Sequence, residues 1–182
     1  MQYQPRMQFP GAGAFPQFEQ QAAVQGPQSN PQVLGYLGRA LSLEFSAGQH
    51  YLAQASLAKY RGEAEYAEGF IILANEEFQH ANLITDRMVA HGALPAGSVL
   101  SPATPANSIL DALRTCEARE IMLINLYGEA ANFSANIGAL ADHALFSRLL
   151  EEEQTQLVRV HGWMEEYYKN MIHNQAPMGS FV

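Results

Sequence analysis

The sequence predicts an all-α fold: an antiparallel four-helix bundle with one long crossover between the second and third helices. Two observations lead to this prediction. From residue 30 onward, apolar residues recur every three or four positions, which is the spacing of a helix with one buried face. Two short breaks and one long proline-containing segment divide this pattern into four stretches. None of the stretches shows the alternation of a β-strand, so no sheet is expected.

The first two stretches are expected to form a helical hairpin over about 30–61 and 63–91. Asn30 is a favoured N-cap residue, and Pro31 suits the first helical position because its missing N–H would have no partner there. Gly62 is well placed to end the first helix in a left-handed conformation. A link of so few residues makes the two helices antiparallel neighbours.

The segment 92–107, GALPAGSVLSPATPAN, is the longest loop expected within the bundle. Its roughly 16 residues can reach about 50 Å at about 3.3 Å each. The second helix is shorter than this, since it has about 29 residues at about 1.5 Å each. The loop can therefore run back along the bundle and place the third helix parallel to the second.

Ser108, followed three residues later by Asp111, resembles a capping box and opens the third helix, which is expected to end near Ala135. Gly138 breaks the helical pattern, and the fourth helix is expected over about 139–170. This second short link makes the third and fourth helices antiparallel as well. Two helical hairpins joined by one long crossover complete the predicted bundle.

Two terminal segments flank the bundle, which is expected to span 30–170. Residues 1–29 are rich in Gln, Pro and Gly and show no helical period, so they cannot bury enough surface to become ordered alone. We expect this extension to be either a disordered tail or an arm that docks on a protein partner through its spaced aromatic residues. Residues 171–182 are expected to form a short C-terminal tail that Pro and Gly interrupt.

Composition narrows the classes of partner. The formal net charge is −8 and no cluster of Lys and Arg is present to neutralise phosphates, which argues against nucleic acid. No run of about 18 apolar residues occurs, so no membrane-spanning helix is expected. The N-terminus lacks the pattern of a secretory signal and Cys116 is the single cysteine, so we expect a cytoplasmic protein.

Each predicted helix carries one glutamate on its buried face, where an apolar residue would pack better. These residues are Glu44, Glu77, Glu120 and Glu153. The positions around them are apolar, as with Leu110, Leu113 and Ile124 on the third helix. Both hairpins separate their two glutamates by 33 residues, so the four carboxylates are expected at equivalent depths in the bundle.

Four buried carboxylates would repel one another unless cations lay between them. His80 follows Glu77 by three residues, and side chains at this spacing project from the same side of a helix. Carboxylates together with Glu-x-x-His pairs form the ligand set of di-iron bundles, and such ligands suit iron or manganese. A lone Glu-x-x-His more often marks a solvated face, and the neighbouring Glu76, Glu151 and Glu152 are expected to be solvated. Repetition on four helices favours the metal site.

The chain from about residue 32 to 170 resembles bacterioferritin, an iron-storage and ferroxidase branch of the ferritin superfamily. Three runs carry the resemblance: VLGYLGRALSLEFSAGQHY, NEEFQHANLITDRMVAHGALP and LLEEEQTQL. The resemblance implies a ferritin-like bundle with a di-iron site. Carried over residue by residue, it implies five of the family's six iron ligands: Glu44, Glu77, His80, Glu120 and Glu153. Tyr51 matches a tyrosine that the family keeps beside the site, where it could donate an electron during oxidation; an ordinary core tyrosine is the alternative.

Two positions depart from the family pattern. Gln156 stands where the family has a second histidine ligand, and its carbonyl oxygen binds metal more weakly than imidazole does, so we expect a lopsided site. Phe78 stands where the family has the methionine that binds haem, so haem is not expected at this position. The other histidines, His50 among them, have no partnered spacing and are expected on the surface or just outside the metal site.

The resemblance implies a ferroxidase subunit that oxidises Fe²⁺ with O₂ or peroxide and stores or detoxifies iron. It also implies a homo-oligomeric cage, or a hetero-oligomer with other ferritin-like subunits. The alternative function is an interaction subunit on a ferritin-like fold with a degraded metal site, docking through residues 1–29. An oxidase that acts on an organic substrate is a third hypothesis, which the equal 33-residue spacings favour less.

Overall fold

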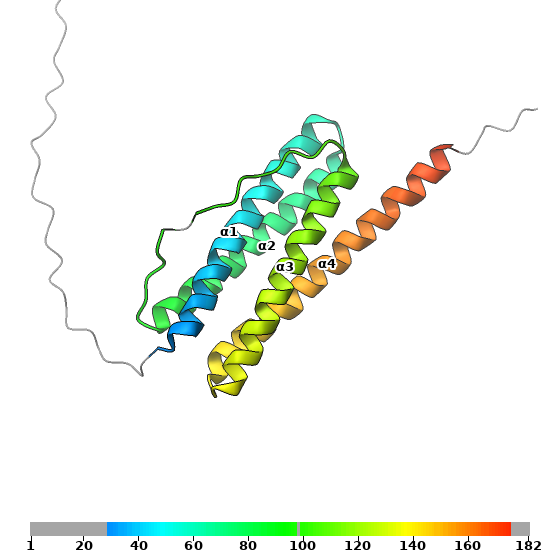
Figure 1. The fold of residues 1–182 in the computed structure, drawn as a ribbon. Coiled ribbons are helices and arrows are strands. Elements are labelled where there is room, and N and C mark those ends of the chain that lie inside the picture. Colours follow the sequence, from blue (N-terminus) through cyan, green and yellow to red (C-terminus); the bar gives the residue numbers. More distant parts are fainter. Residues whose placement is uncertain (1–28, 98, 176–182) are drawn as a thin grey trace, which may run out of the picture.

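Four helices make up the described part of a computed structural model of the chain, residues 29–97 and 99–175 (Figure 1). They are α1 (Pro31–Tyr60), α2 (Ala64–Ala90), α3 (Ile109–Asn136) and α4 (Leu140–Gln175). Figure 1 shows two hairpins, α1–α2 and α3–α4, with the segment between α2 and α3 running back along the bundle. The predicted four-helix bundle with one long crossover is therefore confirmed.

The signals that predicted the helix ends act as expected. Asn30 Oδ1 accepts hydrogen bonds from the backbone N–H groups of Gln32, at 2.9 Å, and Val33, at 3.4 Å, so it caps α1. Gly62 has a φ of +80° and Gly138 a φ of +71°, a conformation that a Cβ would strain. Each of these glycines closes one hairpin directly after its first helix.

The fourth helix is longer than the sequence predicted. It ends at Gln175 rather than near Asn170, because the first residue that cannot continue a helix is Pro177. The prediction for the N-terminal extension falls almost wholly on residues 1–28, which lie outside the described residues. The C-terminal tail expected over 171–182 is helical as far as Gln175, and residues 176–182 lie outside the described residues.

The predicted core of the third helix is partly wrong. Leu113 is fully buried as expected, but Leu110 and Ile124 are only half-buried. Their neighbours Ile109 and Leu123 are buried instead, with exposed fractions of 2% and 1%. The buried stripe of α3 therefore keeps Leu113, Glu120 and Tyr127 but contains Ile109 and Leu123 in place of their apolar neighbours. Helical spacing does not decide which of two adjacent apolar residues is buried.

Helix packing is uneven around the bundle. α1 packs along α2 and α3 along α4, whereas α2 and α4 meet at few points. One such point is Gly69 on α2, where a Cβ atom would lie 2.8 Å from Cη2 of Trp163 on α4. The Trp163 ring also lies edge-on to Phe70, with ring centroids 6.4 Å apart. The absence of a side chain at Gly69 thus lets α4 approach α2.

The crossover between α2 and α3 is fixed to the outside of α1. Gln54 Nε2 donates to the carbonyl oxygen of Thr104 at 2.7 Å, and the Ser101 N–H donates to Ser46 Oγ at 3.0 Å. These hydrogen bonds hold the loop along the bundle, the path expected from its length. Among residues 29–97 and 99–175, no helix is long and apolar enough to cross a membrane.

Candidate metal centre

Four of the predicted ligands converge inside the bundle. Glu44 from α1, Glu77 and His80 from α2, and Glu153 from α4 each offer a ligand atom, and these atoms all lie within 4.8 Å of one another. All four side chains are buried. Glu77 and His80 reach the same point because they are three residues apart on one helix.

The other two predicted ligands are buried beside this group. Glu120 on α3 has an exposed fraction of 0% and Gln156 on α4 one of 2%. Glu120 is not part of the 4.8 Å group, but it is close enough for the charge of Glu44 to raise its pKa, after burial itself. That Glu120 and Gln156 bind metal stays a prediction.

The polar atoms of these residues fit a pair of metal ions. Within the described part of the chain, both carboxylate oxygens of Glu77, Oε2 of Glu153 and both amide atoms of Gln156 lack a hydrogen-bond partner. Glu153 Oε1 contacts His80 Nδ1 at 2.8 Å. One oxygen of Glu44 and one of Glu120 also lack a hydrogen-bond partner. Leaving such a buried group unpaired costs about 1–3 kcal/mol. Oxygen ligands with one imidazole are a donor set that suits iron or manganese.

The pKa values of the clustered residues also favour a cation site. Burial, followed by the charges of Glu44 and Glu153, raises the pKa of Glu77 well above its usual range. Burial also raises the pKa of Glu153 well above normal, although His80 opposes this. Burial alone would lower the pKa of His80, but the carboxylates of Glu153 and Glu44 outweigh it and raise that pKa to about 10. Without metal, the carboxyl groups of Glu77 and Glu153 therefore tend to hold protons, which a cation would displace.

Two tyrosines support the carboxylates across the bundle. Tyr51 on α1 donates a hydrogen bond to Glu120 on α3, and Tyr127 on α3 donates one to Glu44 on α1. Burial raises the pKa of both hydroxyls well above 10, so both stay protonated donors. The sequence analysis predicted a role for Tyr51 only. The signal for Tyr127 was present, because each tyrosine follows a predicted ligand of its own helix by seven residues.

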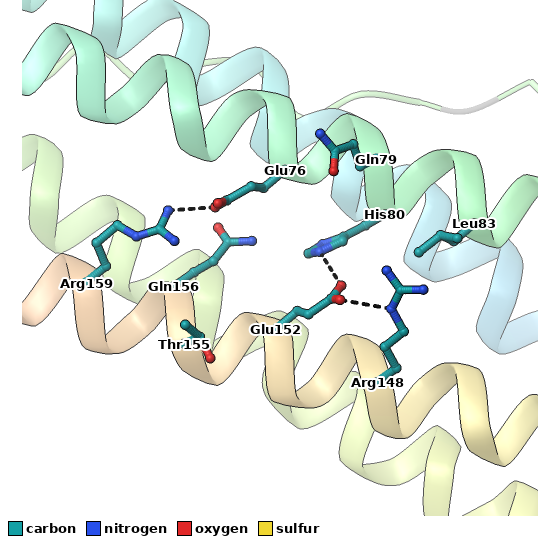
Figure 2. A pocket seen from close by; sticks show the side chains of 9 residues that line it. All are labelled: Glu76, Gln79, His80, Leu83, Arg148, Glu152, Thr155, Gln156 and Arg159. Atoms are coloured by element: carbon teal, nitrogen blue, oxygen red, sulfur yellow. Dashed lines mark hydrogen bonds and ion pairs between the residues drawn. The ribbon is translucent and has the colours of Figure 1, made fainter.

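Glu76 and Glu152 are partly exposed, as expected of solvated charges, but the two residues also take part in contacts between α2 and α4. Glu152 Oε2 lies 3.1 Å from His80 Nε2, and Glu76 Oε2 lies 2.7 Å from Arg159 Nη1. Figure 2 shows both contacts on the rim of a pocket that opens between the two helices. The pocket has a volume of about 260 Å³, and His80 and Gln156 are part of its lining. It gives the buried Glu and His cluster an opening toward the surface.

Phe78 is half-buried on α2 and packs against α1. Its ring centroid lies 6.3 Å from that of Phe45. Gly48 makes room for this ring, since a Cβ at that position would lie 2.7 Å from Cε1 of Phe78. Phe78 thus packs against the aromatic ring of its neighbour on α1. That no haem binds at this position stays a prediction.

His50 is buried, not on the surface. Its side chain is fully enclosed, and burial together with the charge of Arg119 lowers its pKa to about 4. The ring lies 5.9 Å from that of Tyr51 and edge-on to it. A neutral imidazole therefore stands directly behind the tyrosine that reaches Glu120.

Comparisons with known proteins agree with this fold. A family model described as "Ferritin-like domain" matches residues 34–170. Among solved structures, Rhodobacter capsulatus bacterioferritin, described with a metal-free dinuclear site and a heme iron, superposes with a TM-score of 0.75 at 23% identity, over 84% of this chain and 99% of that one. A mycobacterial bacterioferritin gives a TM-score of 0.74 at 22% identity, over 78% and 88%. No curated protein matches the chain.

Proposed function

The chain belongs to the ferritin-like family, and from that premise we propose that it is a bacterioferritin-like iron-binding protein that oxidises Fe²⁺. In this proposal Fe²⁺ is the substrate and O₂ or peroxide is the oxidant, and the Fe³⁺ formed is stored or detoxified. The single observation that carries the proposal is the buried group of Glu44, Glu77, His80 and Glu153, with ligand atoms within 4.8 Å of one another.

Each residue has a distinct part in the proposal. Glu77 and Glu153 lie on opposite helices, which suits carboxylates that would bridge two ions. Both oxygens of Glu77 and Oε2 of Glu153 are without a hydrogen-bond partner among the described residues, and Glu153 Oε1 lies 2.8 Å from His80 Nδ1. Glu44 and Glu120 each have one oxygen free and the other held by a tyrosine, which suits terminal ligands. The Tyr51 hydroxyl, hydrogen-bonded to Glu120, could give one electron to the oxidant, O₂ or peroxide, and pass its proton to that carboxylate. The pair of iron ions supplies the redox chemistry that the side chains lack.

An anaerobic Fe²⁺ titration tests the proposal. We expect saturable binding of about two ions per chain. Glu77→Gln keeps the size of a buried ligand but removes its charge, and it should reduce the number of ions bound. Glu151→Gln is the matched control, because Glu151 is exposed on α4 two residues from Glu153. Linear, unsaturable uptake by the unaltered protein would overturn the proposal.

Assembly and location are also proposals. We propose a homo-oligomeric cage or a hetero-oligomer with related subunits, because large apolar side chains are left exposed on α1 and α2. Among them are Phe45, Leu52 and Ile71, with exposed fractions of 36%, 43% and 45%. A mass measurement of the purified protein tests this point. We further propose a cytoplasmic location, which the single cysteine supports.

The same exposed residues favour a second candidate function, an interaction subunit whose metal site has degraded at Gln156. This candidate docks through residues 1–29, which lie outside the described residues. It predicts that Glu77→Ala leaves the association of the protein unchanged, whereas deletion of residues 1–29 abolishes it. Saturable binding of Fe²⁺ followed by oxidation would speak against it.

A further inference from the structure

The two hairpins present the same arrangement of residues toward the pocket between α2 and α4. Glu76, Glu77 and His80 on α2 have the same spacing as Glu152, Glu153 and Gln156 on α4. The second glutamate of each set belongs to the buried cluster, and the first lines the pocket. The two sets differ at their last residue, which is an imidazole on α2 and an amide on α4.

On one side of the pocket, Glu152 contacts the outer nitrogen of His80. The distance from Glu152 Oε2 to His80 Nε2 is 3.1 Å (Figure 2). The other ring nitrogen, Nδ1, points into the cluster, 2.8 Å from Glu153 Oε1 and 3.6 Å from Glu44 Oε1. Glu152 itself is held by Arg148, whose Nε lies 2.9 Å from its other oxygen. The ring is therefore fixed with its Nδ1 toward the position of a metal.

On the other side, the equivalent carboxylate contacts no ligand. Glu76 is bonded to Arg159 at 2.7 Å, and both amide atoms of Gln156 are without a partner among the described residues. Figure 2 shows Gln156 between the Glu76–Arg159 pair and His80. An amide at position 156 has no ring nitrogen to offer Glu76, so Arg159 takes its place.

A histidine that binds a metal through one nitrogen is oriented by a partner on the other, and loss of that partner weakens metal binding about 10–100-fold. We propose that Glu152 is such a positioning residue for His80, and that Glu76 is its unused counterpart, diverted to Arg159. The chain then binds two divalent cations in two steps of unequal affinity, the tighter one at His80. This inference rests on the proposed metal site and deepens it.

A purely structural role for Glu152 is the competing explanation, since Arg148 and Glu152 are four residues apart on an exposed part of α4. Exposed pairs of this kind contribute little to stability, so a purely structural pair would leave a buried site unchanged. His80 separates the two explanations, because its side chain is only 5% exposed. Without Glu152 its Nε2 would lose its partner near the surface of the pocket.

Titration of the full chain with Co²⁺, followed by visible absorbance, tests the proposal. We expect two binding constants, and Glu152→Ala should weaken the tighter one about 10–100-fold and leave the weaker one unchanged. Glu152→Gln should restore part of the loss, since its carbonyl oxygen can still accept the ring N–H. Glu151→Ala is the control and should behave as the unaltered chain.

A second pair of variants tests the unused counterpart. Gln156→His should strengthen the weaker constant, and adding Glu76→Ala should remove that gain, although Glu76→Ala alone has no effect. Unchanged constants in Glu152→Ala, with normal binding by the unaltered chain, would overturn the positioning role and leave the metal site standing. Absence of saturable Co²⁺ binding by the unaltered chain would overturn both.

Discussion

Replacing Gly69 by alanine perturbs the one close approach between α2 and α4 that a glycine makes possible. The new Cβ would lie 2.8 Å from both Cη2 and Cζ2 of Trp163. The indole cannot give way freely, because it also packs edge-on against Phe70. Forcing an extra methyl group into such a contact costs about 1–3 kcal/mol. Alanine, on the other hand, favours a helix by about 1 kcal/mol over glycine.

Gly38→Ala is the matched control, since a Cβ at this helical position meets nothing within 4 Å. It should gain the full propensity term and be about 1 kcal/mol more stable than the unaltered chain. Gly69→Ala should then be less stable than Gly38→Ala by about 1–3 kcal/mol. Urea unfolding of the metal-free proteins, with unchanged m values, measures this difference. Equal stability of the two variants would refute the packing of Trp163 on α2.

Three further outcomes are expected. Tyr127→Phe removes the hydroxyl that donates to Glu44, and it should lower the free energy of unfolding by about 1 kcal/mol in the metal-free protein, measured by chemical denaturation; an unchanged value would contradict the hydrogen bond. Burial would raise the pKa of Asp142, but the Arg87 guanidinium outweighs burial and lowers it. This pair therefore stabilises the fold fully above the pKa of aspartate in the unfolded chain, about 3.9. The stabilisation is lost as the pH falls through the lower pKa of the folded state. Asp142→Asn should therefore be less stable than the unaltered chain by about 1–2 kcal/mol at pH 7, with the gap closing below about pH 4 in thermal scans; a gap independent of pH would exclude this pair as its source. Burial raises the pKa of the Cys116 thiol. This thiol should therefore react with a disulfide reagent at least about tenfold more slowly in the native than in the unfolded protein, as followed by absorbance. Equal rates would show that the thiol is accessible.

Much of the fold could be predicted because local signals settle it. Asn30, Gly62 and Gly138 each determine a helix end through their own backbone preferences, and the structure follows them. The end of α4 was less certain, since residues after Asn170 contain neither proline nor glycine before Pro177. The sequence also left open which residue of two adjacent apolar pairs on α3 would be buried. These pairs are Ile109 with Leu110 and Leu123 with Ile124, and the first of each is the buried one.

Part of the candidate site could be predicted from the sequence, and part of it could not. Spacing along single helices was enough to predict that Glu77 and His80 share a face, and equal spacings in the two hairpins predicted that Glu44 and Glu153 would join them. The contact between Glu152 and His80 could not be predicted. It depends on how closely α2 approaches α4, which is set by tertiary packing rather than by any pattern within one helix.

Anomalous X-ray diffraction at the iron edge, from crystals loaded with Fe²⁺ under anaerobic conditions, tests the central claim most directly. The account predicts two peaks inside the bundle. One should lie against His80 and Glu44, the other near Gln156 and Glu120, with Glu77 and Glu153 between them. The first peak should be the stronger at limiting iron, because imidazole binds more tightly than an amide oxygen. Iron only on the surface, with no peak among the buried carboxylates, would contradict the account.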